Sequence, residues 1–197
     1  QQVQCFLRPR DVVMPEKNQQ RKPSSKVKTM QRILDAARTE FADKGLDKAH
    51  IQAIAESAGV TKQLIYHYYL SKENLFACVL DESSYHAMTG MAQIDVEHLP
   101  PRDALRSMIY QMFDLFKEDP TLASLATEGL RYHDHHETPR NRMIDIGPLL
   151  TRKMTDIIER GIDEGLFHDH MKPNYIFATA ALMISGTFTG RYLVTAV

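Results

Sequence analysis

Residues 49–75, AHIQAIAESAGVTKQLIYHYYLSKENL, constrain the fold of this chain more than any other stretch. Apolar residues at helical spacing precede Gly59, which breaks the helix, and Thr61 can cap a second short helix directly after the turn. Two helices joined by a short glycine-containing turn are typical of a helix-turn-helix, whose second helix enters the major groove of DNA. The sequence therefore predicts such a unit, whose second helix carries three residues inward: Leu64, Ile65 and Tyr68.

Apolar periodicity in the rest of the chain predicts an all-α fold without strands. A first helix is expected over residues 27–44, where one apolar stripe runs from Met30 to Phe41 and Gly45 supplies the stop. Further helices are expected from Ser71 to about residue 88, from Asp103 through residue 116, over 120–131, from Pro139 to residues 161–165 with a break or kink at 147–148, and over 175–194. Residues 90–102 and 133–138 are expected to be loops.

The formal net charge of −1 hides a strong asymmetry between the two ends of the chain. Residues 17–72 hold eleven Lys and Arg against five Asp and Glu, a net charge of +6, whereas residues 73–197 hold eleven against eighteen, a net charge of −7. A basic N-terminal third on an acidic remainder is typical of a DNA-binding module fused to a separate regulatory body. A solvated charge asymmetry without any partner is the alternative.

The first turn of the second helix carries side chains suited to reading bases. Gln63 can pair bidentately with adenine, and Lys62 can bond guanine or phosphate. One turn later, Tyr66 and His67 project outward and can bond phosphates. Lys72 opens the next helix, where an ammonium and backbone N–H groups suit a phosphate. The alternative is a three-helix unit that only packs, with these residues on its surface.

Residues 33–80 resemble the N-terminal domain of the TetR family of transcriptional regulators. The resemblance lies in Phe41-Ala42 with Gly45, Ile54-Ala55 with Ala58-Gly59-Val60, the run from Leu64 to Tyr69, and the segment Ser71-Lys72-Glu73-Asn74-Leu75. It implies a homodimer that binds a palindromic operator in double-stranded DNA. It also implies a C-terminal helical domain for a small-molecule inducer, whose binding releases the DNA.

Carried onto this chain, the resemblance implies base reading by Gln52, Lys62, Gln63 and Leu64. It implies phosphate contacts by Thr61, Tyr66, His67 and Lys72. The chain departs from the family pattern at two places. Ala49 and His50 stand where hydroxyl residues usually begin the first helix of the pair, so His50 is expected to substitute for the missing contact. Gln63 stands where a small residue is frequent, so this helix is expected to read one more base or to sit differently.

Scattered charges and prolines without an apolar period predict a disordered basic arm over residues 1–26. The resemblance divides the rest of the chain into a helix-turn-helix DNA-binding domain (27–72) and a helical ligand-binding and dimerisation domain (73–197). The segment ATAALMISGTFTGRYLV, residues 178–194, is apolar on nearly every side, which favours a dimer interface. Gly186 and Gly190 would suit either close approach of a partner helix or packing within the chain. Candidates for the inducer pocket are Met108, Met112, Phe113 and Phe116, with Tyr110, Leu125, Met154 and Ile158, although each also suits an ordinary core.

Two histidine-rich segments, residues 133–137 and 168–170, contain possible metal ligands. They lack the helical spacing of known zinc motifs, and the two cysteines are far apart, so neither a metal site nor a cofactor is expected. A metal-dependent hydrolase built on these loops and an architectural DNA binder without an inducer remain the alternatives to a regulator. No run of about eighteen apolar residues occurs, so no membrane span is expected, and a cytoplasmic protein without enzymatic activity is predicted.

Overall fold

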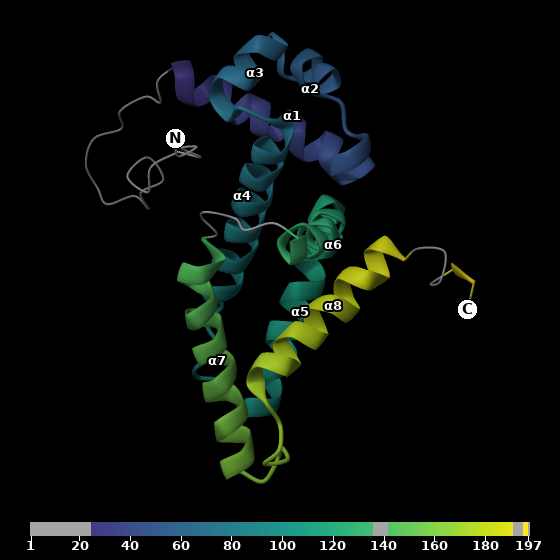
Figure 1. The fold of residues 1–197 in the computed structure, drawn as a ribbon. Helices are drawn as coiled ribbons and strands as arrows, with labels where there is room; N and C mark the ends of the chain where they lie inside the picture. Colours follow the sequence, from purple (N-terminus) through teal and green to yellow (C-terminus); the bar gives the residue numbers. More distant parts are fainter. Residues whose placement is uncertain (1–24, 136–141, 191–194, 197) are drawn as a thin grey trace. The chain divides into compact units, whose positions relative to one another are not determined.

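The computed structural model describes residues 25–135, 142–190 and 195–196. Over these residues the chain is helical and has no strand, which confirms the all-α prediction. Residues 1–24 of the expected arm lie outside the described residues. The elements, drawn in chain order in Figure 1, are α1 (Ser25–Lys48), α2 (Ile51–Ala58), α3 (Lys62–Tyr69), α4 (Lys72–Ala92), α5 (Pro101–Glu118), α6 (Pro120–His135), α7 (Met143–Asp163) and α8 (Pro173–Thr189).

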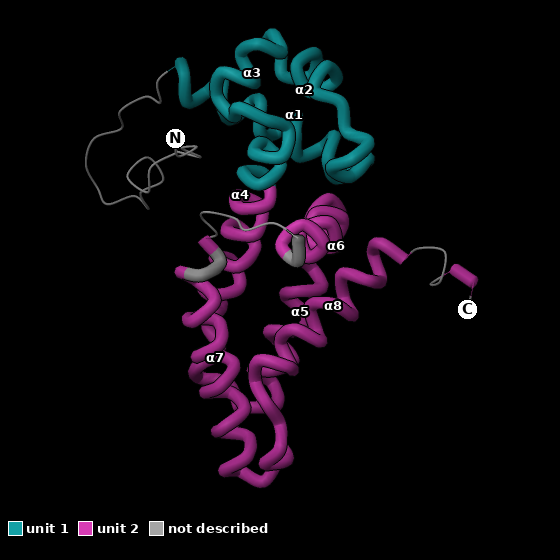
Figure 2. The backbone as a smooth tube through the Cα atoms, in the orientation of Figure 1, with its two compact units in different colours: residues 1–79 teal, residues 80–197 magenta. Residues whose placement is uncertain are grey.

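The chain divides into two compact units, residues 1–79 (unit 1) and residues 80–197 (unit 2). The division falls within α4, so this helix contributes its first part to unit 1 and its second part to unit 2 (Figure 2). Among the described residues, no helix is both long enough and apolar enough to cross a membrane.

The core of unit 1 is built around α1. The expected apolar stripe of this helix is buried from Met30 to Phe41, and the Phe41 ring meets that of Phe76 edge to face at 4.9 Å between centroids. Tyr69 on α3 is 1% exposed, and its hydroxyl donates to the Met30 carbonyl oxygen at 3.2 Å. Of the three residues expected to point inward, Ile65 is buried whereas Leu64 and Tyr68 are only half-buried, because the fully buried side of α3 carries Ile65 and the residue four positions later.

The core of unit 2 centres on α5, which packs against α6, α7 and α8. Buried residues recur along α5 at intervals of four, at positions 104, 108, 112 and 116. They join buried side chains from α7 and from the α4–α5 loop, among them Leu150, Met154, Ile157, Ile94 and Val96.

Basic residues of α7 and at its N-cap hold the second part of α4 and the loop that follows it. The Arg142 Nε donates to the Asp81 carboxylate at 2.6 Å, and its guanidinium carbon lies 4.3 Å from the centre of the Tyr85 ring. Lys153 donates to two carbonyl oxygens at and just beyond the end of α4, at 2.6 and 2.5 Å. Arg160 donates to two carbonyls of the α4–α5 loop at 3.2 and 3.1 Å. The bond to Ala92 satisfies a carbonyl group that the end of a helix leaves without a partner, and the bonds to the loop carbonyls hold the loop against α7.

Several expected helix ends are displaced. α4 continues beyond residue 88 through Gly90 to Ala92, and α6 continues beyond residue 131 to His135. α5 begins at Pro101, since proline is well accommodated in the first turn of a helix. α7 passes through Pro148, whose missing N–H removes a single hydrogen bond near the helix start. α8 ends at Thr189; residues 191–194 and the expected start at Pro139 lie outside the described residues.

Candidate nucleic-acid interface

The turn between α2 and α3 has the geometry that its residues require. Gly59 adopts φ 63° and ψ 42°, a left-handed conformation that glycine tolerates without cost from a Cβ. The Val60 N–H returns to the Ala55 carbonyl oxygen at 3.0 Å. The Thr61 hydroxyl oxygen then accepts the Leu64 N–H at 3.2 Å, so this residue caps α3 as expected.

Burial of one side of α3 fixes the direction of the other side. Ile65 is completely buried, so Lys62, Gln63, Tyr66 and His67, which lie on the remaining faces of the helix, are exposed. Thr61, His50 and Gln52 are exposed as well, whereas Leu64 and Lys72 are half-buried. All nine residues that the sequence nominated for DNA contacts therefore retain at least partial access to solvent, and seven of them are exposed.

A shallow open groove of about 530 Å³ lies between the start of α2, α3 and the start of α4. It brings together five of the nominated residues, and it does not include Thr61, Gln63, Leu64 or His67. The five nominated residues in its lining are His50, Gln52, Lys62, Tyr66 and Lys72.

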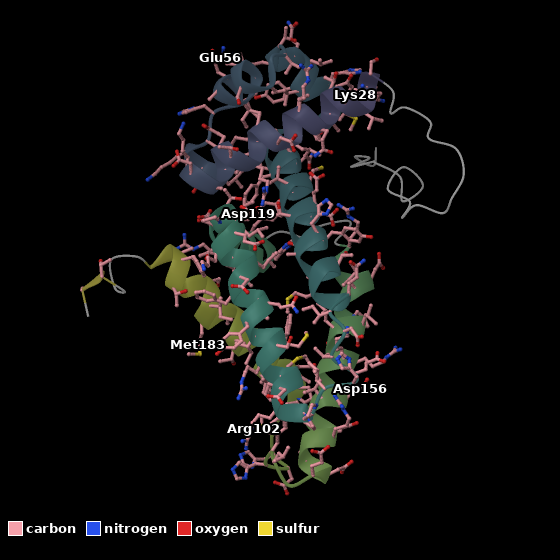
Figure 3. The ribbon with its side chains drawn as sticks, turned by 180° about the vertical axis from the view of Figure 1, so that it is seen from behind. Lys28, Glu56, Arg102, Asp119, Asp156 and Met183 are labelled. Atoms are coloured by element: carbon pink, nitrogen blue, oxygen red, sulfur yellow. The ribbon has the colours of Figure 1, made fainter. Side chains whose placement is uncertain are left out.

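Gln52 is held within its own helix. Its side-chain amide donates to the carboxylate of Glu56 one turn later, and both side chains are exposed on α2 (Figure 3 labels Glu56). The bond orients the amide before any ligand arrives. Glu56 was not among the residues nominated from the sequence, although its spacing of four residues from Gln52 on a helix was visible.

Leu70, at the junction of α3 and α4, was not anticipated as part of the groove. It adopts φ 65° and ψ −43°, and it has the only positive φ among the described residues other than glycine. The Ser71 N–H donates across it to the Tyr69 carbonyl oxygen at 2.8 Å, which makes a strained γ-turn. The side chain is 56% exposed. Leucine carries no sequence signal for a positive φ, so this turn could not be foreseen.

Replacing Leu70 with glycine is expected to stabilise unit 1 by about 1 kcal/mol, because glycine adopts this backbone conformation without the strain of a Cβ. The exposed leucine side chain contributes little burial energy to offset that gain. Urea unfolding followed by circular dichroism measures the difference. A Leu70→Ala variant is the control, since it keeps the Cβ and should not be stabilised. Equal midpoints for the glycine variant and the parent would show that the turn is unstrained.

The start of α2 lacks the hydroxyl cap that the family pattern would supply. His50 occupies the N-cap position, and its side chain makes no capping hydrogen bond. Instead, the backbone N–H of His50 donates at 3.0 Å to the carboxylate of Glu40 on α1. This carboxylate also accepts from the Lys44 ammonium at 3.0 Å. Partial burial raises the pKa of the Glu40 carboxyl, but the hydrogen bonds from His50 and Lys44 and the nearby positive charge outweigh it and hold the pKa below its ordinary value.

Lys72, expected to contact a phosphate, is engaged within the protein. Its ammonium donates to the carbonyl oxygens of Asp47 and Ala49 at 3.2 and 3.3 Å. Ser71 caps α4 as expected, because its hydroxyl oxygen accepts the Asn74 N–H at 3.1 Å.

The inducer-pocket candidates in unit 2 separate into two groups. Met108, Met112 and Phe116 lie in the core, with exposures of 1, 5 and 9%. Phe113 is 40% exposed and packs on Phe188 at 5.3 Å between ring centroids. Tyr110, named with the wider set, is 63% exposed, whereas the remaining three, Leu125, Met154 and Ile158, are buried.

An open groove of about 630 Å³ also lies in unit 2, along α7 and the segment that begins α8. Among the candidates for an inducer pocket, Ile158 alone contributes to its lining. In the histidine-rich segments, the rings of His168 and His170 stack at 5.3 Å, and His133 belongs to α6 and not to a loop. Within the described part of the chain, no three His, Cys, Asp or Glu side chains gather as metal ligands would; His136 and Glu137 lie outside it.

Comparisons with known proteins agree with this architecture. The family described as "Bacterial regulatory proteins, tetR family" matches residues 33–79, and "Tetracyclin repressor-like, C-terminal domain" matches residues 101–197. The transcriptional repressor NicS of Pseudomonas putida is 30% identical over 143 residues, 72% of this chain and 67% of that protein. The repressor KstR2 of Mycolicibacterium smegmatis is 25% identical over 157 residues, 79% of this chain and 75% of that protein.

Solved structures share the fold. The putative regulator SCO4942 of Streptomyces coelicolor superposes with a TM-score of 0.62 at 26% identity, covering 85% of this chain and 84% of that one. FadR of Bacillus subtilis, solved in complex with stearoyl-CoA, has a TM-score of 0.63 at 22% identity, covering 82% of this chain and 88% of that one. Both parts of the chain and its relatives point to a single family. The chain belongs to the TetR family of bacterial regulatory proteins, whose members are DNA-binding transcriptional regulators.

Proposed function

We propose that this protein is a ligand-responsive transcriptional repressor that binds a palindromic operator as a homodimer and is released by a small-molecule inducer. The proposal rests on the surface formed by α2, α3 and the start of α4. Seven of the nine nominated side chains are exposed there, beside a buried Ile65, and five of the nine line one groove. The names of NicS and KstR2 support repression, although the relative FasR of Mycolicibacterium smegmatis, 31% identical over 87 residues, is named an activator.

The proposed DNA contact of each residue follows from the chemistry of its side chain. Lys62 and Gln63 in the first turn of α3 read base edges, with help from Gln52 and the apolar Leu64. Thr61, Tyr66 and His67 bond phosphates. The Thr61 oxygen is occupied as an acceptor by the cap, but a hydroxyl still has its hydrogen to donate. His50, at the N-cap of α2, lines the groove and contacts the DNA backbone.

Dimerisation through α8 is supported by its exposed apolar residues. Tyr175, Leu182 and Met183 are 69, 54 and 69% exposed, and they recur on one side of the helix (Figure 3 labels Met183). A Cβ added at Gly186 would meet nothing within 4 Å, which suits approach by another helix. A two-fold dimer presents two identical reading helices and therefore selects a palindrome.

Residues 27–72 are proposed to bind DNA, and unit 2 is proposed to bind the inducer. The core of unit 2 is rich in methionine, which repacks readily around varied ligands: Met91, Met108, Met112 and Met154 are all buried. Acting on DNA, the protein would work in the cytoplasm.

Two other functions, a hydrolase and an architectural DNA binder, are less favoured, since the matched relatives are named as regulators.

In vitro selection of DNA by the 197-residue chain tests the proposal. We expect a palindromic preference. Lys62→Ala and Gln63→Ala should each relax preference at one position in each half-site, costing about 1–3 kcal/mol there. Lys117→Ala, on an exposed position of α5, is the matched control and should leave the preference unchanged.

Three results would contradict the proposal. Unchanged preference in both first-turn variants would mean that α3 is not the reading helix. Salt-sensitive binding without any preferred sequence would favour an architectural binder. Stoichiometric metal whose removal abolishes a hydrolytic activity would favour the enzyme. A screen for compounds that release the selected DNA would then test the inducer.

A further inference from the structure

The short loop between α1 and α2 is held by two oppositely charged side chains from other parts of unit 1. The loop ends at His50 and leads into α2, whose second residue is Gln52, and both His50 and Gln52 line the groove described above. The carbonyl groups of Asp47, at the end of α1, and of Ala49, in the loop, accept from Lys72 at the start of α4. The backbone N–H of His50 donates to Glu40 on α1. The buried Ala49, 2% exposed, anchors the loop between them.

The position of Lys72 is unusual for a residue that serves only DNA. A cation in the first turn of a helix lies at the positive end of the helix dipole, which disfavours it. Here the ammonium donates to the carbonyls of Asp47 and Ala49, at and just beyond the end of α1, where carbonyl groups lack intrahelical partners. Lys72 is half-buried, and these two bonds use two of the three hydrogens of its ammonium. The side chain thereby ties the end of α1 to the start of α4.

Glu40 supplies the complementary bond. Its carboxylate accepts the His50 N–H at 3.0 Å, at the N-terminus of a helix that has no side-chain cap of its own. A carboxylate is favoured at that end by the helix dipole. Both carboxylate oxygens also lie 3.0 Å from the Lys44 ammonium, one turn along α1, so the acceptor is held in place. The start of α2 is therefore fixed from the side of α1 as well.

We propose that Lys72 and Glu40 are positioning residues for DNA recognition: they fix the start of α2, and with it His50 and Gln52, relative to the reading helix α3. In this role Lys72 acts through the loop and not by contact with a phosphate. The inference rests on the proposed DNA-binding function and adds to it two residues that set the geometry of the groove.

The two roles of Lys72 make different predictions about salt. A lysine that neutralises a phosphate contributes about 0.9 to the slope of log affinity against log salt concentration for each contact. A positioning lysine contributes nothing to that slope, because no counterion is released at its site. Its removal instead lowers affinity by the same factor at every salt concentration. It also alters preference at the bases that the start of α2 reaches.

The experiment compares the parent protein with Lys72→Met, Lys72→Arg and Glu40→Gln, measuring affinity for the selected operator across a range of salt concentrations. Lys72→Met keeps the apolar stem and removes the donors, and we expect about a tenfold loss of affinity with an unchanged slope. Lys72→Arg, which can donate to both carbonyls, should restore most of the affinity and the base preference. Lys62→Met is the comparison for a cation that faces DNA, and it should reduce the slope.

A slope reduced by Lys72→Met by about 0.9 for each protomer would overturn the inference, since that is the result for a phosphate contact. Unchanged affinity in Lys72→Met would overturn it as well. If the parent protein selects no operator, the proposed function fails instead. Hydrogen exchange without DNA tests the ties independently: Lys72→Met and Glu40→Gln should each speed exchange in residues 49–54 and not in α3. Equal exchange in the variants and the parent would show that the loop does not depend on these side chains.

Discussion

Replacing Phe41 with alanine is expected to destabilise unit 1 by about 3–5 kcal/mol and to abolish operator binding. The ring is completely buried and packs edge to face on Phe76 at 4.9 Å, so its loss removes both apolar burial and an aromatic pair. Domains of this kind are stable by about 5–15 kcal/mol in total, and a loss of this size leaves a large fraction unfolded. Urea unfolding and operator binding by the same preparation measure the two effects.

Tyr110→Ala is the matched control for this substitution. It also truncates an aromatic side chain to alanine, but on a side chain that is 63% exposed, so its effect should stay within about 0.5 kcal/mol. A Phe41→Ala protein that unfolds at the parent's urea concentration would show that α1 does not organise unit 1. Loss of binding with full retention of stability would instead place Phe41 in the DNA contact itself.

The burial of Phe41 was predictable from sequence because α1 is long and its apolar residues recur on one face. Met30, Ile33, Leu34 and Ala37 were expected on that stripe, and all are buried. The turn at Gly59 and the cap at Thr61 were predictable for a different reason. Each needs a particular residue type, a glycine with positive φ or a hydroxyl at an N-cap, and that requirement is visible in the sequence itself.

Contacts between distant residues were beyond the reach of local patterns. Glu40 and His50 are ten positions apart, and Lys72 lies twenty-five positions from Asp47. No periodicity relates such pairs, so the sequence nominated Lys72 for DNA and overlooked Glu40. The helical state of Gly90 was missed because the preference against glycine in a helix is only about 1 kcal/mol, which packing easily overrides.

Because glycine alone says little about a helical position, replacing it with alanine is expected to have opposite effects on stability at two positions, 161 and 90. Gly161→Ala is expected to destabilise unit 2 by about 2–3 kcal/mol. Gly161 is buried in the last turns of α7, and the chain reverses at Gly165, where φ is 69°, so that the Phe167 ring packs directly over it. A Cβ at position 161 would overlap that ring, and the ring, which packs on the core of unit 2, would have to move outward.

Gly90→Ala, in the last turn of α4, should instead stabilise the protein by up to about 1 kcal/mol, because an added Cβ there meets nothing within 4 Å. Helix propensity favours both substitutions equally, so the difference between them isolates the steric cost at Phe167. Thermal and urea unfolding of the two variants beside the parent measure it. If Gly161→Ala were stabilising too, the Phe167 ring would not lie over α7. A Gly161→Ala, Phe167→Ala double variant, compared with Phe167→Ala alone, should show only the propensity gain, since the obstructing ring is absent from both proteins.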